Sequence, residues 1–216
     1  MLKYGKNKKF NPSLLSSHNI DRKTAALIPE GSKVLDIGCA TGFLGDYLMK
    51  QKACVVDGLE MGTEEAKIAK NNLRYVYIGN AENKGDLNKI KQKYDVVNAS
   101  ALIEHLKDPL AALKEWKKLL RKDGSLILST SNIAHFSMRL SLLRGKFDYK
   151  DYGILDNTHL RLFTIDSFKQ IVQEAGYTID IFDIDAEGGG FPRVSILGSK
   201  LFPGLFAYQM LIKAHV

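Results

Sequence analysis

The sequence has few of the features that mark disulfide-bonded, membrane-spanning or metal-binding proteins. Only 2 of its 216 residues are cysteines, and Cys39 and Cys54 form neither a disulfide framework nor the paired spacing of a zinc site. No apolar run approaches the roughly 18 residues of a membrane span, and the N-terminus lacks the apolar core of a signal peptide. These absences indicate a cytoplasmic protein whose cysteines are packing residues.

The chain also lacks internal repeats, low-complexity tracts and any composition shift that would mark a domain boundary. Its 45% hydrophobic residues suffice for a sizeable core, so we expect one domain over residues 1–216. The net charge of +7 permits contact with nucleic acid, phosphorylated sugars or membrane surfaces, and selects none of them. Peripheral membrane contact and the oligomeric state are therefore left open.

The most informative stretch begins with residues 33–37, a short apolar run typical of a buried parallel strand. Phe43–Lys50 has helical spacing, and Gly38 and Gly42 before it allow the backbone to approach a ligand. A strand, a glycine turn and a helix form the first unit of a nucleotide-binding α/β sheet. The carboxylate of Asp36 would repel a dinucleotide pyrophosphate, but it suits a cation or an amine.

Polar residues also close the strands that we expect next. Ala53–Leu59 is the second strand, and Glu60 after it is placed to accept hydrogen bonds from ribose hydroxyls. Arg74–Ile78 is the third, and the fourth begins at Tyr94. Ligands of open α/β sheets bind at the carboxyl ends of the strands, so residues 99–105 should face the ligand.

Four strings resemble a known family. Residues 36–42, Asp-Ile-Gly-Cys-Ala-Thr-Gly, resemble motif I of the class I S-adenosylmethionine-dependent methyltransferases, with Ala40 where that family more often has glycine. Residues 79–82, Gly-Asn-Ala-Glu, are similar to the family's Gly-Asp-Ala-Glu. Residues 102–109 resemble the stretch after the fourth strand in ubiquinone-biosynthesis O-methyltransferases, and residues 153–164 resemble a subgroup often found beside glycosyltransferases.

The resemblance implies a Rossmann-like α/β fold with helices on both faces of a seven-stranded, mostly parallel sheet. The last strand, over Ala207–Val216, should run antiparallel between the fifth and sixth strands. An arm and a helix over residues 1–30 precede the sheet. Residues 132–163 and 186–206, which follow the fifth and sixth strands and lack regular periodicity, should form a cap that selects the substrate.

S-adenosylmethionine is the cofactor that the resemblance implies, and S-adenosylhomocysteine is its product. Asp36 should hold the methionine end and Glu60 the ribose. The full set of expected cofactor-binding residues is Asp36, Gly38, Ala40, Gly42, Glu60, Met61, Asn80, Ala81, Ala99 and Ser100. No metal site is expected, because adjacent residues such as Glu104 and His105 rarely share an ion and no further ligand has suitable spacing.

The expected reaction is methyl transfer to an oxygen of a small molecule, a sugar or a lipid-linked glycan. His105, or failing it His159, is the candidate general base, because histidine titrates near neutral pH. Tyr149, Tyr152 and Arg161 are the expected substrate-contacting residues of the cap, and Arg161 would suit phosphate-bearing acceptors.

Three other functions are weighed against this one. A nicotinamide-dependent oxidoreductase is disfavoured by Asp36 and by the lack of a second mononucleotide-binding half. A nucleic-acid methyltransferase is disfavoured because Asn98-Ala99-Ser100-Ala101 lacks the prolines of an amine-methylating motif, and no Pro-Cys nucleophile is present. A protein that binds S-adenosylmethionine without turnover remains open.

Overall fold

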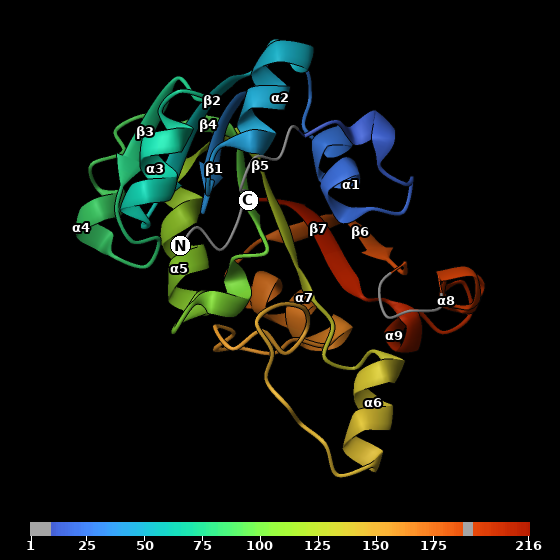
Figure 1. Ribbon diagram of the computed structural model, residues 1–216. Helices are drawn as coiled ribbons and strands as arrows, with labels where there is room; N and C mark the ends of the chain where they lie inside the picture. The colour runs from blue at the N-terminus through green and yellow to red at the C-terminus, as the bar shows by residue number, and fades with distance from the viewer. Residues whose placement is uncertain (1–9, 188–191) are drawn as a thin grey trace.

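The computed structural model describes residues 10–187 and 192–216, and they contain a seven-stranded sheet with the order β3-β2-β1-β4-β5-β7-β6 (Figure 1). The strands are β1 (Lys33–Ile37), β2 (Val55–Glu60), β3 (Tyr75–Ile78), β4 (Tyr94–Ser100), β5 (Leu120–Ser131), β6 (Thr178–Asp185) and β7 (Gln209–His215). β7 pairs antiparallel with both β5 and β6, and the pairs on the β1 side are parallel. The predicted fold class and the predicted place of the last strand are confirmed.

Helices cover both faces of this sheet. One face carries α1 (Ile20–Leu27), α2 (Phe43–Lys52) and α3 (Thr63–Ala69). The other carries α4 (Lys84–Leu87), α5 (Pro109–Trp116) and α7 (Ile165–Glu174). The described residues also contain three short 3-10 helices, at Pro12–Leu14, Ile103–His105 and Lys117–Leu119.

Local sequence signals set where several helices begin. The Asn19 side chain accepts from the backbone N–H groups that open α1, and Asp108 does the same for α5, whose first residue is Pro109. Thr164 and Ser167 form a reciprocal capping box at the start of α7. These caps satisfy donors that a helix cannot satisfy internally, so each helix begins at a defined residue.

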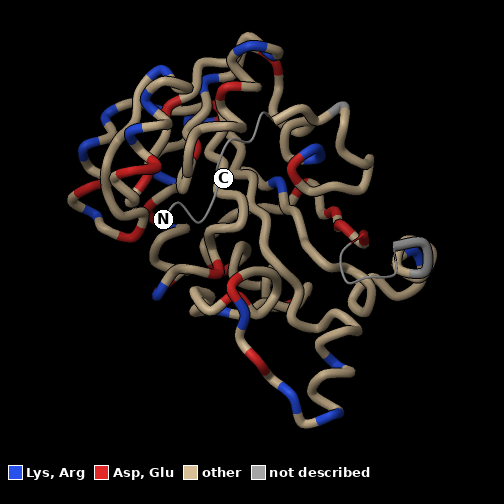
Figure 2. Tube along the Cα trace, viewed as in Figure 1, with Lys and Arg blue, Asp and Glu red and all other residues tan. Residues whose placement is uncertain are grey.

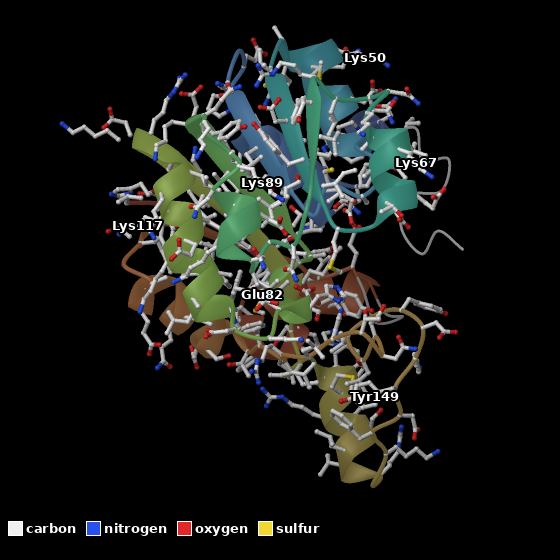
Figure 3. The ribbon with its side chains drawn as sticks, turned by 90° about the vertical axis from the view of Figure 1, so that its left-hand side faces the viewer. Lys50, Lys67, Glu82, Lys89, Lys117 and Tyr149 are labelled. Atoms are coloured by element: carbon white, nitrogen blue, oxygen red, sulfur yellow. The ribbon has the colours of Figure 1, made fainter. Side chains whose placement is uncertain are left out.

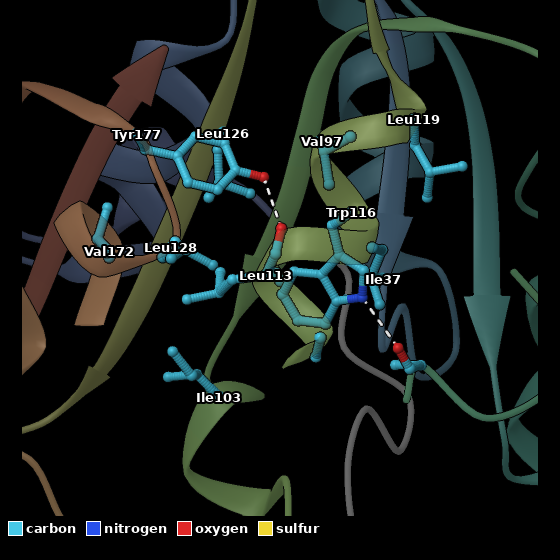
Figure 4. Close-up of a cluster of buried hydrophobic side chains, with 14 of the residues drawn as sticks. Ile37, Val97, Ile103, Leu113, Trp116, Leu119, Leu126, Leu128, Val172 and Tyr177 are labelled. Carbon is cyan, nitrogen blue, oxygen red and sulfur yellow. Dashed lines mark hydrogen bonds between the residues drawn. The ribbon is translucent and has the colours of Figure 1, made fainter. Parts of the chain in front are cut away.

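Two amphipathic aromatic residues, Trp116 and Tyr177, pack in the core beneath α5 and α7 (Figure 4). Trp116 is fully buried, and its indole Nε1 donates to the carbonyl of Ala81 over 2.9 Å. Tyr177 donates its hydroxyl to the carbonyl of Leu113 over 2.9 Å. Burying a polar group is costly unless it is paired, so these bonds let large side chains fill the core without an orphaned donor. The Trp116 bond also fixes the loop that follows β3.

The two insertions are less irregular than the sequence suggests. Residues 132–163 contain α6 (Phe136–Leu143), which projects from the rest of the molecule, and residues 186–206 contain α8 (Pro192–Ser199) and α9 (Pro203–Phe206). The expectation that both stretches lack regular secondary structure was therefore wrong. Residues 1–9 of the expected N-terminal arm lie outside the described residues. No helix among them has the length and apolar character needed to cross a bilayer.

Gly45 offers a test of how tightly α2 packs on the sheet. A methyl group there would lie 2.9 Å from Cγ1 of the fully buried Val56 and would also collide with Leu73. Overpacking of this kind costs about 1–3 kcal/mol, which outweighs the gain in helix propensity of about 1 kcal/mol. Gly45→Ala should therefore lower the free energy of unfolding measured by chemical denaturation. Gly204→Ala is the matched control, because its new methyl group would meet nothing within 4 Å. Equal stability of the two variants would contradict this packing.

Candidate active site

The site is built at the carboxyl ends of β1, β2 and β4. Asp36 on β1 stands opposite Asn98 on β4, and the Asn98 amide donates to the Asp36 carboxylate over 2.6 Å. Only 6% of Asp36 is exposed. Burial raises the pKa of Asp36 to about 7, the bond from Asn98 acts in the opposite direction, and the negative charge of Glu60 raises the pKa further. A cation bound beside Asp36 would replace the solvation that the carboxylate has lost.

The turn after β1 brings bare backbone to the same place. Gly38, Ala40 and Gly42 have φ values of 73°, 48° and 76°, in the region that favours glycine. Left-handed backbone costs a residue with a Cβ roughly 1–2 kcal/mol, so Ala40 is strained. Its N–H donates to Glu60 Oε2 over 2.8 Å, and this bond helps to hold the strained turn.

The Glu60 carboxylate accepts hydrogen bonds from the loop after β1 and from the loop after β2. Its Oε1 accepts from the N–H of Gly62 over 2.7 Å, while Oε2 accepts from Ala40. Each carboxylate oxygen has a second acceptor position, so Glu60 can still receive two hydroxyl groups. The carboxylate is thus oriented before any ligand arrives.

The loop after β3 supplies the next wall. The Asn80 side-chain oxygen accepts from the N–H of Glu82 over 2.8 Å, and the Asn80 N–H donates to Asp86 over 3.0 Å. The amide oxygen has a second lone pair for a ligand. Met61, on the opposite loop, leaves 68% of its surface exposed and can cover an aromatic ring.

These loops enclose one side of a cavity of about 900 Å³. Of the expected cofactor-binding residues, the lining contains Asp36, Gly38, Ala40, Glu60, Met61, Asn80, Ala81 and Ser100. Gly42 and Ala99 are not part of the lining. Gly42 is the N-cap residue of α2, and Ala99 is fully buried in β4. These two positions shape the backbone around the cavity.

The expected substrate residues are scattered. Tyr152 lines the cavity. Tyr149 leaves 57% of its surface exposed on the projecting segment after α6 (Figure 3). Arg161 borders a separate shallow depression beside Pro109, and its Nε donates to the carbonyl of Lys107 over 3.1 Å.

The far end of the cavity brings His105 and His159 together, with ring centroids 4.8 Å apart. His159 Nδ1 lies 2.9 Å from the carbonyl of Ile154, and His105 Nδ1 lies 3.2 Å from the carbonyl of Thr158. A carbonyl can only accept, so we assign the hydrogen to Nδ1 in both rings. In the neutral form each ring then carries its basic lone pair on Nε2.

Glu104 lies beside both histidines and is only 3% exposed. Its backbone carbonyl accepts from the N–H groups of Leu160 and Arg161, over 2.8 and 3.0 Å, so the segment from the first insertion is held against the loop after β4. Burial raises the pKa of Glu104 to about 7, and the charge of Asp156 raises it further. The side-chain oxygen Oε2 has no hydrogen-bond partner among the described residues.

The expectation that no third metal-ligating side chain lies near Glu104 and His105 was wrong. Glu104, His105 and His159 each present a ligand atom, and these atoms all lie within 4.8 Å of one another. Chain spacing did not reveal the third group, because His159 returns from the insertion through the backbone bonds to Glu104. The oxygen and nitrogen donors of this set suit a zinc-like ion.

Three further residues of the site were missed. Asn98 precedes Ser100 by two positions on one strand, so alternation places both on one face, and the Ser100 hydroxyl donates to the Asn98 amide oxygen over 3.0 Å. That alternation could have identified Asn98. Glu104 and Asp156, at 3% and 2% exposure, carried no comparable signal, because their burial depends on how the insertion folds back.

Comparison with known proteins agrees with this geometry. The model of a family described as "Methyltransferase domain" matches residues 13–180. The chain belongs to this family. Its sheet order and antiparallel last strand are those of a class I S-adenosylmethionine-dependent methyltransferase.

Relatives of this chain include ubiquinone biosynthesis O-methyltransferases. The Haemophilus ducreyi protein is 39% identical over 110 residues, covering 47% of this chain and 46% of the relative. The Aliivibrio fischeri protein is 37% identical over 109 residues, covering 47% and 45%. The matched segment thus spans less than half the length of either relative.

Solved structures share the fold. The magnesium protoporphyrin IX methyltransferase of Synechocystis, with bound S-adenosylhomocysteine, has a TM-score of 0.65 at 16% identity and covers 98% of this chain and 90% of its own. An S-adenosylmethionine-dependent methyltransferase of Archaeoglobus fulgidus has a TM-score of 0.63 at 19% identity, covering 89% and 90%.

The residues at this end of the cavity fit S-adenosylmethionine. The buried carboxylate of Asp36, which has a hydrogen bond from Asn98 and no cation among its named neighbours, suits the cationic methionine end, and the oriented carboxylate of Glu60 suits the two ribose hydroxyls. Met61 can cover the adenine face.

Glu60→Ala should weaken S-adenosylmethionine binding at least tenfold in calorimetry, because hydrogen bonds to charged groups contribute about 1.5–3 kcal/mol. Glu60→Gln, which keeps one acceptor oxygen, should lose less. Glu64→Ala is the matched control, since Glu64 is exposed and pairs with Lys67 of the same helix. Unchanged affinity in Glu60→Ala would refute the ribose assignment.

Proposed function

We propose that this chain is an S-adenosylmethionine-dependent methyltransferase that acts on a hydroxyl oxygen of a small molecule or glycan. One observation carries the proposal: a single cavity connects the carboxylates and glycine turn of the cofactor end to a pair of half-buried histidines. The matched relatives are O-methyltransferases by name, which supports oxygen as the acceptor atom.

The cofactor, when bound, supplies a methyl group already activated on a sulfonium. The protein therefore has to align the acceptor and to remove its proton. Alignment alone can contribute about 7–11 kcal/mol in well-oriented systems, and a general base adds roughly 10²–10⁴-fold. The walls that would align the acceptor come from β4, from its following loop and from residues 152–160.

His105 and His159 are positioned for the proton transfer. Their Nδ1 atoms face backbone carbonyls, so the basic Nε2 atom of either ring can accept a hydrogen from an acceptor hydroxyl. Because the two rings are adjacent, one can hold the proton while the other keeps the geometry.

A nucleic-acid substrate is disfavoured by the charge of the cavity. Its lining holds many more carboxylates than lysines or arginines, whereas phosphate backbones are bound by clustered cations. Over the described part of the chain, Lys and Arg are dispersed along the trace among Asp and Glu (Figure 2).

His105→Ala or His159→Ala should lower turnover by about 10²-fold or more at pH 7 and leave S-adenosylmethionine affinity unchanged. Formation of S-adenosylhomocysteine with phenols and methyl glycosides measures this. His215→Ala is the matched control, because His215 pairs with Asp180 at the opposite end of the sheet. If both site variants keep full turnover from pH 6 to pH 8, neither histidine is the base. A wild-type protein that binds the cofactor but never consumes it would be a binding protein only.

A further inference from the structure

Exposed hydrophobic side chains gather on the segment that projects from the molecule, α6 and the residues after it (Figure 1). Among the described residues, no other stretch of equal length exposes as many large apolar side chains as residues 140–152. We call these side chains the apolar surface: Leu140, Leu142, Leu143, Phe147, Tyr149 and Tyr152. Single apolar residues are normal on a protein surface, whereas a group of this kind marks an interaction site.

The opposite side of α6 is held against the rest of the molecule. Met138 is buried and packs with Ile154 and Leu155, and the ring of Phe136 lies 5.7 Å from that of Phe206 on α9. One side of α6 therefore already makes the contacts that fix the helix. The leucines on its outer side have no place in this core, so their exposure is built into the fold.

Exposed cations surround the apolar surface and outnumber the carboxylates beside them. The cations of this stretch are Arg139, Arg144, Lys146 and Lys150, and its carboxylates are Asp148 and Asp151, all six exposed. Arg139 donates to the carbonyl of Ala134 over 2.7 Å, and in the described part of the chain no acidic side chain pairs with any of the four cations. Their charge is therefore available to an anionic partner.

We propose that residues 139–152 dock on a bilayer surface that carries anionic lipids. Burial of apolar side chains at the acyl boundary and attraction between cations and anionic headgroups are the two interactions that hold an interfacial segment. Tyr149 and Tyr152 each combine an apolar ring with a polar hydroxyl, a character that suits the headgroup level. Lysine and arginine stems can lie along the apolar surface while their charges reach the headgroups.

The charge of this segment favours a membrane over a second copy of the chain. In a two-fold contact the same patch faces itself, so the excess cations of one copy would meet those of the other. An anionic bilayer instead supplies the opposite charge over the whole patch. With eight residues, α6 is far too short to cross a bilayer, so the segment would lie on the surface.

The apolar surface also reaches the active site. Tyr152 leaves 79% of its surface exposed and lines the cavity as well. A docked molecule would therefore hold that edge of the cavity at the bilayer. The docking itself does not depend on the methyl transfer proposed above.

Co-sedimentation of the full chain with lipid vesicles tests the proposal. Vesicles of equal parts phosphatidylglycerol and phosphatidylcholine should bind the wild type at least tenfold more strongly than pure phosphatidylcholine, and about 0.5 M NaCl should weaken that binding, because salt screens exposed charges. Leu143→Glu should lower the partition coefficient at least tenfold. Leu14→Glu is the matched control, since Leu14 has the same 83% exposure but lies in the 3-10 helix before α1, and it should leave binding unchanged.

A second pair of variants tests the cations. Arg144→Glu with Lys146→Glu should weaken binding to the anionic vesicles at least tenfold, because each cation near an anionic surface contributes about fivefold. Lys91→Glu with Lys122→Glu changes the net charge equally, and these exposed residues lie just before β4 and early in β5, at the sheet edge opposite the site. This control should lose less than threefold. Circular dichroism shows that each variant is folded.

Four results would overturn the inference. The first is a wild type that does not bind the anionic vesicles, and the second is a Leu143→Glu variant that binds as the wild type does. The third is a charge control that loses as much as the Arg144 and Lys146 variant, which would show adsorption by net charge alone. The fourth, from sedimentation velocity without vesicles, is a dimer that Leu143→Glu dissociates, which would show that a second copy covers the apolar surface. No cofactor takes part, so none of these results bears on the methyl transfer.

Discussion

The structure of the site depends on one buried hydrogen bond, from the Asn98 amide to the Asp36 carboxylate across β1 and β4. It sits where the first strand ends and the glycine turn begins, so the position of the turn depends on it. Burial raises the pKa of Asp36 to about 7 from 3.8, so between these values the folded protein holds a proton that the unfolded chain has released. The contribution of Asp36 to stability is therefore highest at low pH and falls as pH rises through about 7. At neutral pH the empty site is destabilising, and a bound cation removes that cost.

Two other carboxylates of the cavity also differ in how they are hydrogen-bonded. Glu60 is oriented by two backbone N–H groups, whereas Glu104 has a buried oxygen with no partner in the described chain. Both residues line the same cavity, Glu60 at one end and Glu104 at the other. The link between the ends is the loop after β4, whose Glu104 carbonyl holds the segment that carries His159. Cofactor and acceptor surfaces are thus parts of one hydrogen-bonded unit, which explains how groups far apart in sequence can be aligned for an in-line transfer.

Much of the fold and of the cofactor end could be predicted from the sequence, because those signals are local. Asp36 and Glu60 directly follow or end apolar runs, and strand ends gather at one edge of a parallel sheet. At the other end of the cavity, the sequence indicated His105 and His159 as alternative bases, but it could not predict that their rings are adjacent, since His159 reaches His105 only through backbone bonds that span more than 50 residues. The helices α8 and α9 were missed although each begins with proline, Pro192 and Pro203, a residue that favours the first helical position. Glycine and aromatic residues around those prolines obscured the signal.

The central claim, that a buried carboxylate at the end of β1 binds the cationic end of S-adenosylmethionine, is tested most directly by measuring affinity against pH. Calorimetry on the wild type should show affinity rising about tenfold from pH 5.5 to pH 7.0, because the free protein must release the proton of Asp36, whose pKa is about 7, to bind the cation. Asp36→Asn should bind weakly and lose most of this pH dependence, while Glu104→Gln should retain it. A wild-type affinity that is flat over this range, or an Asp36→Asn variant with the wild-type slope, would contradict the account.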